Sequence, residues 1–207
     1  MATIKTIKPA GGGDYTTLQA WENWADDQVS GDQWAECYTG GDMGPVIIQT
    51  WAATTSSVLY PKIYTNLDQR HIGKDDGTGA FINTGSVSAI NNFIDYVRIE
   101  GIRVEMGSSL NAGIHINLGA DNCLIDSNLI VANNQVSVDG IYCTFNVAYS
   151  TITIQNNLIY GYGYLSNGIT VYSMYSNTGS MPSCYIYNNT LHNISGLGIN
   201  LYCYLIV

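Results

Sequence analysis

Two carboxylates near the middle of the chain could act together in catalysis. Glu100 and Asp126 stand at matching places in two similar segments, each two residues after Arg98 and Leu124 respectively. Paired carboxylates on neighbouring strands carry out glycoside hydrolysis, and their separation decides the stereochemical outcome. Acidic groups that bind a calcium ion, beside an arginine or lysine base, would instead suit a lyase acting on uronates.

The row of carboxylates is short, however. Gln155 and Tyr187 take the position of Asp126 in the next two segments, so the row has only two members. A hydrolase of this kind needs its carboxylates held together on adjacent strands. We therefore interpret Arg98, Glu100 and Asp126 as a partly neutralised charge cluster on a solvated face.

The histidines and cysteines do not form a reactive group either. The three histidines are dispersed along the chain: His71, His115 and His192. None has a serine or cysteine partner that the spacing would bring close. The five cysteines are an odd number at irregular intervals: Cys37, Cys123, Cys143, Cys184 and Cys203. We therefore predict no catalytic residue, no metal, no cofactor and no disulfide.

These side chains belong to a chain that repeats itself about every 26 to 32 residues. One motif, Ile-x-x-Asn-x-Ile/Leu, occurs at 125–130, 154–159 and 186–191. A second motif, which opens with Gly-Ile, begins at Gly113, Gly140, Gly168 and Gly198. Repeats of this length, with short strands and no helix between them, indicate an all-β fold, a parallel β-helix in which each coil stacks on the last.

Stacking at the strand spacing of ~4.8 Å places equivalent residues in columns. The sequence predicts one column of Ile125, Ile154 and Ile186, and another of Ile114, Ile141, Ile169 and Ile199. It also predicts an asparagine ladder of Asn128, Asn157 and Asn189, with left-handed backbone and amides that bond their stacked neighbours. Cys123, Cys143 and Cys184 fall at inward positions, so we expect buried apolar side chains there.

The N-terminal region predicts a cover for this solenoid. Thr16 and Gln19 fit a capping box at the start of a short helix. Leu18, Trp21 and Trp24 fall on one face of that helix. Because the first coil of a solenoid leaves an apolar bore and a free sheet edge, we expect these three residues, the lid, to cover them.

The chain is therefore divided into two parts. Residues 1–43 form an N-terminal strand and the capping α-helix, and residues 44–207 form the coils. The sequence reaches Val207 inside a strand without a polar cap. We expect the edge of that coil to be covered in the working state by another copy, by a neighbouring protein or by further residues.

The composition excludes several classes of protein. A net charge of −9 argues against nucleic acid as a partner, because binding it requires a basic surface. No apolar run reaches the ~20 residues of a membrane span, so we expect no membrane partner. The opening MATIKTIKPAGGG lacks the hydrophobic segment of a secretory signal, which predicts a protein made in the cytoplasm without a signal peptide.

The first forty residues resemble a known family. The string GDYTTLQ at 13–19 is similar to the leader of pectin methylesterases and of many phage-associated β-helix proteins. The longer GGGDYTTLQAWENW, followed by QWAECYTG at 33–40, resembles the phage and prophage branch of the pectate-lyase-like superfamily. The resemblance implies a right-handed parallel β-helix and a place in a virion, outside the cell after lysis. It implies no single activity, because this fold hosts enzymes, adhesins and virion parts.

Tyrosine is the most informative residue type of the second half. Eleven of the sixteen tyrosines lie between residues 142 and 204. The expected contacts for a protein or a glycan are Tyr142, Tyr172, Tyr185, Tyr187, Tyr202 and Tyr204. A tyrosine ring has a rigid apolar face and a polar tip, which suits both roles. An equally favoured alternative is that tyrosine is frequent here only because it suits β-strands.

Together these features predict a non-enzymatic structural or adhesive phage protein, such as a head decoration protein, a head fibre or a tail-fibre component. We expect homo-oligomers, with a trimer as the specific prediction, and contacts with other virion proteins or with a surface glycan. One alternative is a polysaccharide lyase or a glycoside hydrolase, complete or truncated. A less favoured alternative is a bacterial surface adhesin.

Overall fold

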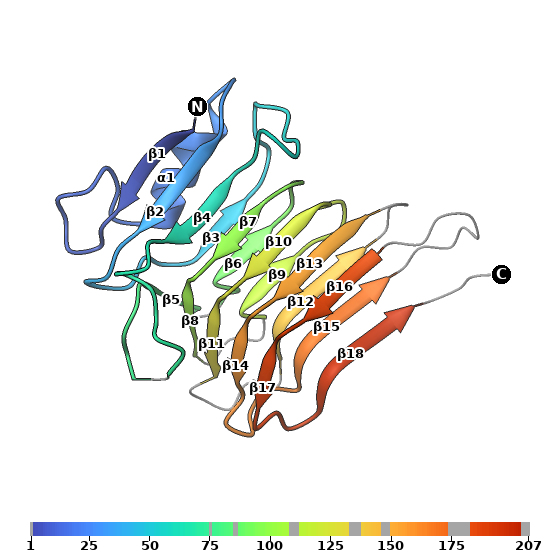
Figure 1. Cartoon of the computed structure of the whole chain (residues 1–207). Helices are drawn as coiled ribbons and strands as arrows, with labels where there is room; N and C mark the ends of the chain where they lie inside the picture. Colours follow the sequence, from blue (N-terminus) through green and yellow to red (C-terminus); the bar gives the residue numbers. More distant parts are fainter. Residues whose placement is uncertain are drawn as a thin grey trace.

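The computed structural model is a parallel β-solenoid of about six turns with a short helix at its N-terminal end (Figure 1). The structure describes residues 2–74, 76–84, 87–107, 112–132, 138–145, 150–173 and 183–203. Each full coil contributes one strand to each of three sheets, and all strand pairs between coils are parallel. The prediction of an all-β parallel β-helix is therefore confirmed.

The strands are short because each sheet turns a corner into the next. The first sheet contains β1 (Thr3–Ile7), β2 (Gln33–Cys37), β4 (Lys62–Thr65), β7 (Arg98–Glu100), β10 (Cys123–Asp126), β13 (Thr151–Gln155) and β16 (Ser183–Tyr187). The second contains β5 (Phe81–Asn83), β8 (Arg103–Met106), β11 (Leu129–Ala132), β14 (Leu158–Tyr160) and β17 (Thr190–His192). The third contains β3 (Val46–Ile48), β6 (Ile90–Asn92), β9 (Ile114–Ile116), β12 (Asp139–Phe145), β15 (Asn167–Ser173) and β18 (Leu197–Cys203).

Alternation within each strand decides which side chains fill the bore. In β13, for example, Ile152 and Ile154 are buried while their neighbours are partly exposed. The predicted columns are confirmed, because Ile125 pairs with Ile154 and Ile154 with Ile186. The column of Ile114, Ile141, Ile169 and Ile199 is confirmed as well.

The asparagines stack along the corner between the first and second sheets. Asn128 Nδ2 donates to Asn157 Oδ1 at 3.0 Å, and Asn157 Nδ2 donates to Asn189 Oδ1 at 2.9 Å. The left-handed backbone belongs instead to the residue before each of them, with φ of 56° at Ser127, 56° at Asn156 and 54° at Asn188. The expectation of left-handed backbone in the ladder asparagines is therefore wrong, and they contribute through their amide groups.

The helix α1 (Leu18–Asp26) begins one residue later than the capping box predicted. Its N-cap is Thr17, whose hydroxyl accepts a hydrogen bond from the Ala20 amide at 3.2 Å, and not Thr16. Gln19 does not close a capping box, because its Oε1 accepts from the Ile47 amide of β3 at 2.9 Å. The Gln19 side chain therefore makes a tertiary contact with β3, although the local sequence pattern predicts that it caps the helix.

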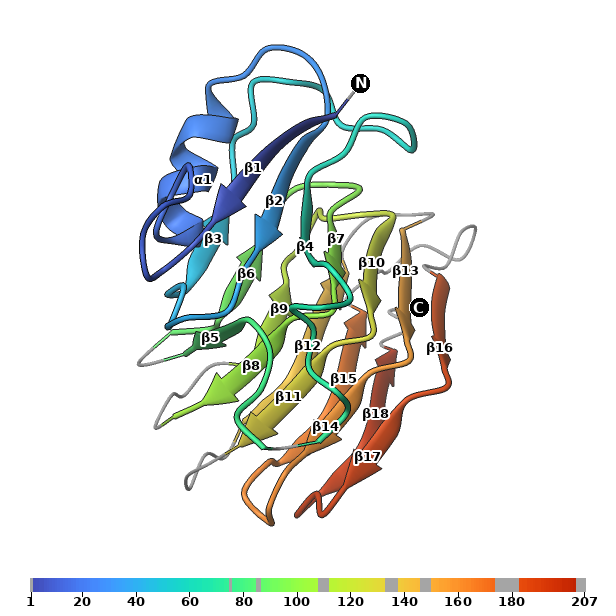
Figure 2. The same ribbon diagram turned by 60° about the vertical axis from the view of Figure 1, so that its left-hand side comes forward.

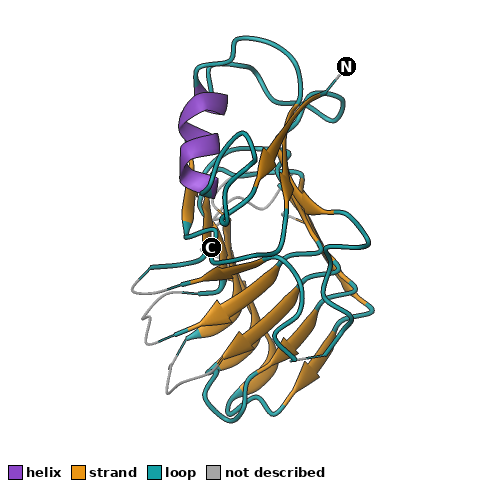
Figure 3. Ribbon diagram, turned by 90° about the vertical axis from the view of Figure 1, so that its left-hand side faces the viewer, coloured by secondary structure: helices purple, strands orange, loops and turns teal. Residues whose placement is uncertain are grey.

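The apolar face of α1 packs over the first coil, at the N-terminal end of the stack (Figures 2 and 3). Leu18 and Trp21 are completely buried. Trp24 is only partly buried, and its ring lies 6.2 Å from that of Tyr15, with the Lys5 ammonium 5.2 Å from its centre. The three lid residues therefore differ in how much of the bore they cover.

The polar side of α1 pairs with the free edge of β3, the last strand of the third sheet. Besides the bond to Gln19, Glu22 Oε1 accepts from the Gln49 amide at 3.1 Å, and the Asp26 carbonyl accepts from the Ala52 amide at 3.1 Å. The helix therefore covers the bore and also accepts hydrogen bonds from the backbone amides of the sheet edge. Covering an edge strand with a helix is one way in which β proteins protect such edges.

β1 and β2 are part of the first sheet and not a separate layer. Thr3 to Ile7 pair in parallel with Gln33 to Cys37, and β2 pairs in turn with β4. The stacked strands therefore start well before residue 44, and β1 and β18 lie at opposite ends of the stack (Figure 1).

Candidate functional site

The charge cluster lies where the sequence placed it, on the outer face of the first sheet. Glu100 of β7 pairs in register with Asp126 of β10. The Lys62 ammonium lies 2.6 Å from a Glu100 carboxylate oxygen. Asp126 accepts hydrogen bonds at 2.8 to 3.0 Å from Ser127, Gln155 and Asn156. Burial raises the pKa of Asp126, but these donors outweigh it and hold the pKa below its ordinary value.

Such an arrangement suits a structural cluster better than an acid–base pair. A general acid needs a raised pKa so that it still carries its proton near neutral pH. Asp126 has the opposite shift, and Glu100 is engaged by a lysine. Among the described residues, no group of three His, Cys, Asp or Glu side chains could hold a metal ion.

The histidines lie on different elements and do not meet. His71 Nε2 lies 2.9 Å from the Ser127 carbonyl oxygen, and burial lowers the pKa of this imidazole. The His115 ring lies 5.1 Å from that of Tyr142, and the His192 ring lies 5.4 Å from that of Tyr160. Each is therefore a packing residue of its own corner or face.

The described cysteine side chains are free thiols, three of them buried and Cys184 partly buried. Cys123 pairs with Ile152, and Ile152 pairs with Cys184, as the repeat predicted. Desolvation by burial raises the pKa of Cys123 to about 12, and that of Cys184 to about 12. A thiol with so high a pKa is a poor nucleophile, so these residues fill the bore.

The predicted tyrosines divide into two groups. Tyr142 and Tyr172 are partly buried on the outer face of the third sheet, and the Tyr172 ring lies 6.0 Å from that of Tyr202. In the last coil, Tyr185, Tyr187 and Tyr202 are 55%, 48% and 46% exposed. Tyr204 lies outside the described residues. We call Tyr185, Tyr187 and Tyr202 the terminal tyrosines.

The interior of the last coil is open as well. Ile199 and Leu201 of β18 pair with Ile169 and Val171 of β15. The inner pair is buried, whereas Ile199 is 45% and Leu201 is 64% exposed. Leu197, on the same strand, is 55% exposed. Tyr202 follows Leu201 on β18, so one of the terminal tyrosines lies beside these exposed apolar side chains. Exposed apolar side chains that lie together are typical of interaction sites.

One aromatic cluster is not predicted by the sequence pattern. On the outer face of the first sheet, Trp34 stacks on Tyr60 at 5.9 Å and meets Tyr64 edge-on at 6.1 Å. Lys62 lies 5.4 Å from the centre of the Trp34 ring, and Arg98 lies 4.3 Å from that of Tyr60. These cations occupy the ring faces, so the cluster stabilises the N-terminal coils and offers no open platform. Alternation within β2 and β4 predicts outward side chains, but these coils lack the repeat motif that would align them.

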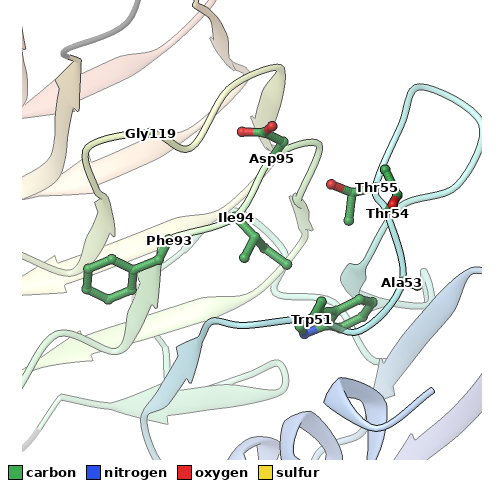
Figure 4. A pocket seen from close by; sticks show the side chains of 8 residues that line it. All are labelled: Trp51, Ala53, Thr54, Thr55, Phe93, Ile94, Asp95 and Gly119. Carbon is green, nitrogen blue, oxygen red and sulfur yellow. The ribbon is translucent and has the colours of Figure 1, made fainter. Parts of the chain in front are cut away.

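A pocket of about 310 Å³ is not predicted by the sequence pattern either (Figure 4). It lies where the third sheet turns into the first, between segments 49–61, 93–97 and 117–122 of three successive coils. In the view of Figure 4, Asp95 lies above Ile94, and Thr54 and Thr55 lie above Trp51, across the pocket from Asp95. The three corners differ in length and sequence, so the repeat pattern could not predict it.

Comparison of the chain with protein-family models, with curated proteins and with solved structures finds no match. Nor does the described part of the chain contain a helix with the length and apolar character of a membrane span. Two surfaces are therefore the candidate functional sites: the exposed face of the last coil and the corner pocket.

Proposed function

We propose that this chain is a non-enzymatic structural protein of a phage particle, and that its last coil packs against other copies of the same chain. One observation carries the proposal. Ile169 is buried in an inner coil, whereas Ile199, which pairs with it in the last coil, is 45% exposed. Leu201, on the same strand as Ile199, is 64% exposed. A surface of this kind is costly in a free monomer.

The charge distribution supports self-association. The sequence has no Asp, Glu, Lys or Arg after Asp139. Copies can therefore meet along their last coils without removing an ion from water, which is strongly unfavourable when the ion stays unpaired. The terminal tyrosines add large rigid faces with polar tips, the composition of interface centres.

The two ends of the stack differ, and this limits how copies can join. The free edge of β3 is paired by α1, so a copy stacked on the N-terminal end would meet a helix. Stacking the last coil of one copy on the first coil of the next would give a filament, and the helix blocks that contact. Closed assemblies remain, because two like surfaces form a dimer and two unlike surfaces form a ring when the rotation closes. We therefore favour a closed homo-oligomer, and the resemblance of the first forty residues to the phage branch of the pectate-lyase-like superfamily favours a trimer in a virion.

A charge introduced into the last coil tests this role. Tyr185→Asp and Leu201→Asp should each convert the assembly into monomers, as measured by sedimentation velocity. Tyr185 is 55% exposed, so its replacement leaves the core intact. Leu67→Asp, at a residue 86% exposed between β4 and β5, is the matched control and should keep the native mass. Variants that sediment like the unmodified protein would contradict the proposal.

The second candidate is a polysaccharide lyase or glycoside hydrolase. The stacked carboxylates of Glu100 and Asp126 are the observation in its favour. Their lysine and amide partners argue against it, as described above. Release of reducing ends or of unsaturated products from a polysaccharide panel, lost in Asp126→Asn, would establish the enzyme in place of the structural role.

A further inference from the structure

The corner pocket has the dimensions and lining of a ligand site. Its volume of about 310 Å³ lies at the lower end of the ~300–1,000 Å³ range of small-molecule pockets. Two aromatic residues line it, and they differ in role. Trp51 is partly buried and meets Trp21 of the lid edge-on at 6.1 Å, so it is a fixed part of the pocket. Phe93 is 43% exposed, and its ring points away from Asp95 and Thr55 (Figure 4).

Polar groups in the pocket are available to a ligand. Asp95 Oδ1 accepts a hydrogen bond from the Asp121 amide at 2.7 Å. Within the described residues, Asp95 Oδ2 and the hydroxyls of Thr54 and Thr55 make no hydrogen bond. One carboxylate oxygen therefore fixes the corner, and the other can accept from a ligand hydroxyl.

The charge of the pocket restricts the ligand. None of the eight described residues that line it is basic. Burial and the neighbouring Asp121 carboxylate both raise the pKa of Asp95, against the effect of the Asp121 amide. Because Asp95 and Asp121 are neighbouring carboxylates and the described lining has no basic side chain, the pocket disfavours an acidic ligand.

A sugar residue matches these features. Its ring has an apolar C–H face that packs against an aromatic side chain, and its edge carries hydroxyls that donate to a carboxylate and exchange bonds with threonine hydroxyls. We propose that the corner pocket binds one residue of a neutral glycan, with Trp51 against the apolar face of the sugar and with Thr55 and Asp95 bonded to its hydroxyls. The open rim of the corner allows the rest of the glycan to continue into solvent.

This inference goes beyond the proposed assembly role and does not depend on it. The pocket is built by the first three coils, whereas the terminal tyrosines belong to the last. A protein that stays monomeric could still bind the glycan, and an assembled protein could fail to do so. The two proposals therefore fail separately.

The test is calorimetric titration of the full chain with cellohexaose, maltohexaose and chitohexaose, alongside hexagalacturonate as the acidic probe. We expect saturable binding of at least one neutral oligosaccharide, with a Kd at or below about 1 mM. Hexagalacturonate should bind at least about tenfold more weakly, since like charges disfavour it. Absence of binding by all three neutral probes, or equal binding of the acidic one, would overturn the proposal.

Variants locate the site. Thr55→Val and Asp95→Asn should each weaken binding by roughly tenfold, as expected for the loss of one good hydrogen bond. Asp95→Asn keeps the oxygen that accepts from Asp121, and Thr55→Val lies in a loop and keeps the side-chain shape, so both should fold. Tyr162→Ala, at an aromatic 45% exposed on another corner, is the control and should bind normally. Normal binding by both pocket variants would place the glycan elsewhere.

Discussion

Ile169 and Ile199 occupy the same column in neighbouring coils, yet Ile169 is fully buried and Ile199 is 45% exposed. The difference arises because Ile169 has a coil on both sides, whereas Ile199 is covered on one side only. At the other end of the stack, Ile48 of β3 is fully buried under the lid. Within the described residues, the lid therefore covers the first coil, whereas inward side chains of β18 are exposed.

Truncation of the lid should expose the N-terminal bore. Trp21→Ala removes a fully buried side chain, and we expect it to destabilise the fold by ~3–5 kcal/mol. Trp24→Ala should cost less, because that ring is only partly buried. Urea denaturation followed by circular dichroism measures both. Equal losses for the two variants would show that the unequal burial has no energetic meaning.

The buried Glu22 should give the lid a pH dependence. Burial raises the pKa of Glu22 above its ordinary value of about 4.5. The folded state therefore binds this proton more tightly, so its contribution to stability is full below pH 4.5 and is lost as pH rises through the folded pKa. Glu22→Gln keeps an acceptor for the Gln49 amide and removes the titration.

Thermal melts of both proteins between about pH 4 and pH 7 test this linkage. The melting temperature of Glu22→Gln, relative to that of the unmodified protein, should increase as pH rises. Glu22→Ala, which also loses the acceptor, should be less stable than Glu22→Gln throughout, by ~1–3 kcal/mol for an unpaired amide. Parallel curves for the unmodified protein and Glu22→Gln would contradict the linkage.

The asparagine ladder should be most sensitive at its centre. Asn157 bonds the Asn128 amide, the Ile125 carbonyl and the Asn189 side chain, and it is 1% exposed. Asn157→Ala leaves several buried groups unpaired, at ~1–3 kcal/mol each, so we expect it to unfold or nearly so. Asn189→Ala, at the partly exposed end of the ladder, is the comparison and should be milder in the same urea titration. The opposite order would contradict the ladder's structural role.

The repeat made the columns predictable. One period of the sequence equals one coil, and the alternation of apolar residues sets the register, since a slip by one residue would turn Ile125 and Ile154 outward. The same logic placed Cys123 beside Ile152 and Glu100 beside Asp126. The repeat predicts left-handed backbone one residue too late, because the sequence carries no direct signal for φ. Ser127 also stands where later coils have asparagine.

Features outside the repeat were not predictable. Gln19 pairs with Ile47 across 28 residues, a contact that depends on where α1 docks. The pocket near Asp95 joins corners of unequal length, and the cations over Trp34 and Tyr60 come from strands of different coils. Sequence periodicity describes what every coil shares, whereas these sites arise from what the coils do not share.

The native mass of the protein tests the central claim most directly. Multi-angle light scattering of the purified full chain, over a range of concentrations, should give three times the chain mass of 22.5 kDa. Hydroxyl-radical footprinting on the same sample should show protection of the side chains of Ile199 and Leu201, which one chain alone leaves exposed. A stable monomer at all concentrations, with these residues unprotected, would contradict the account.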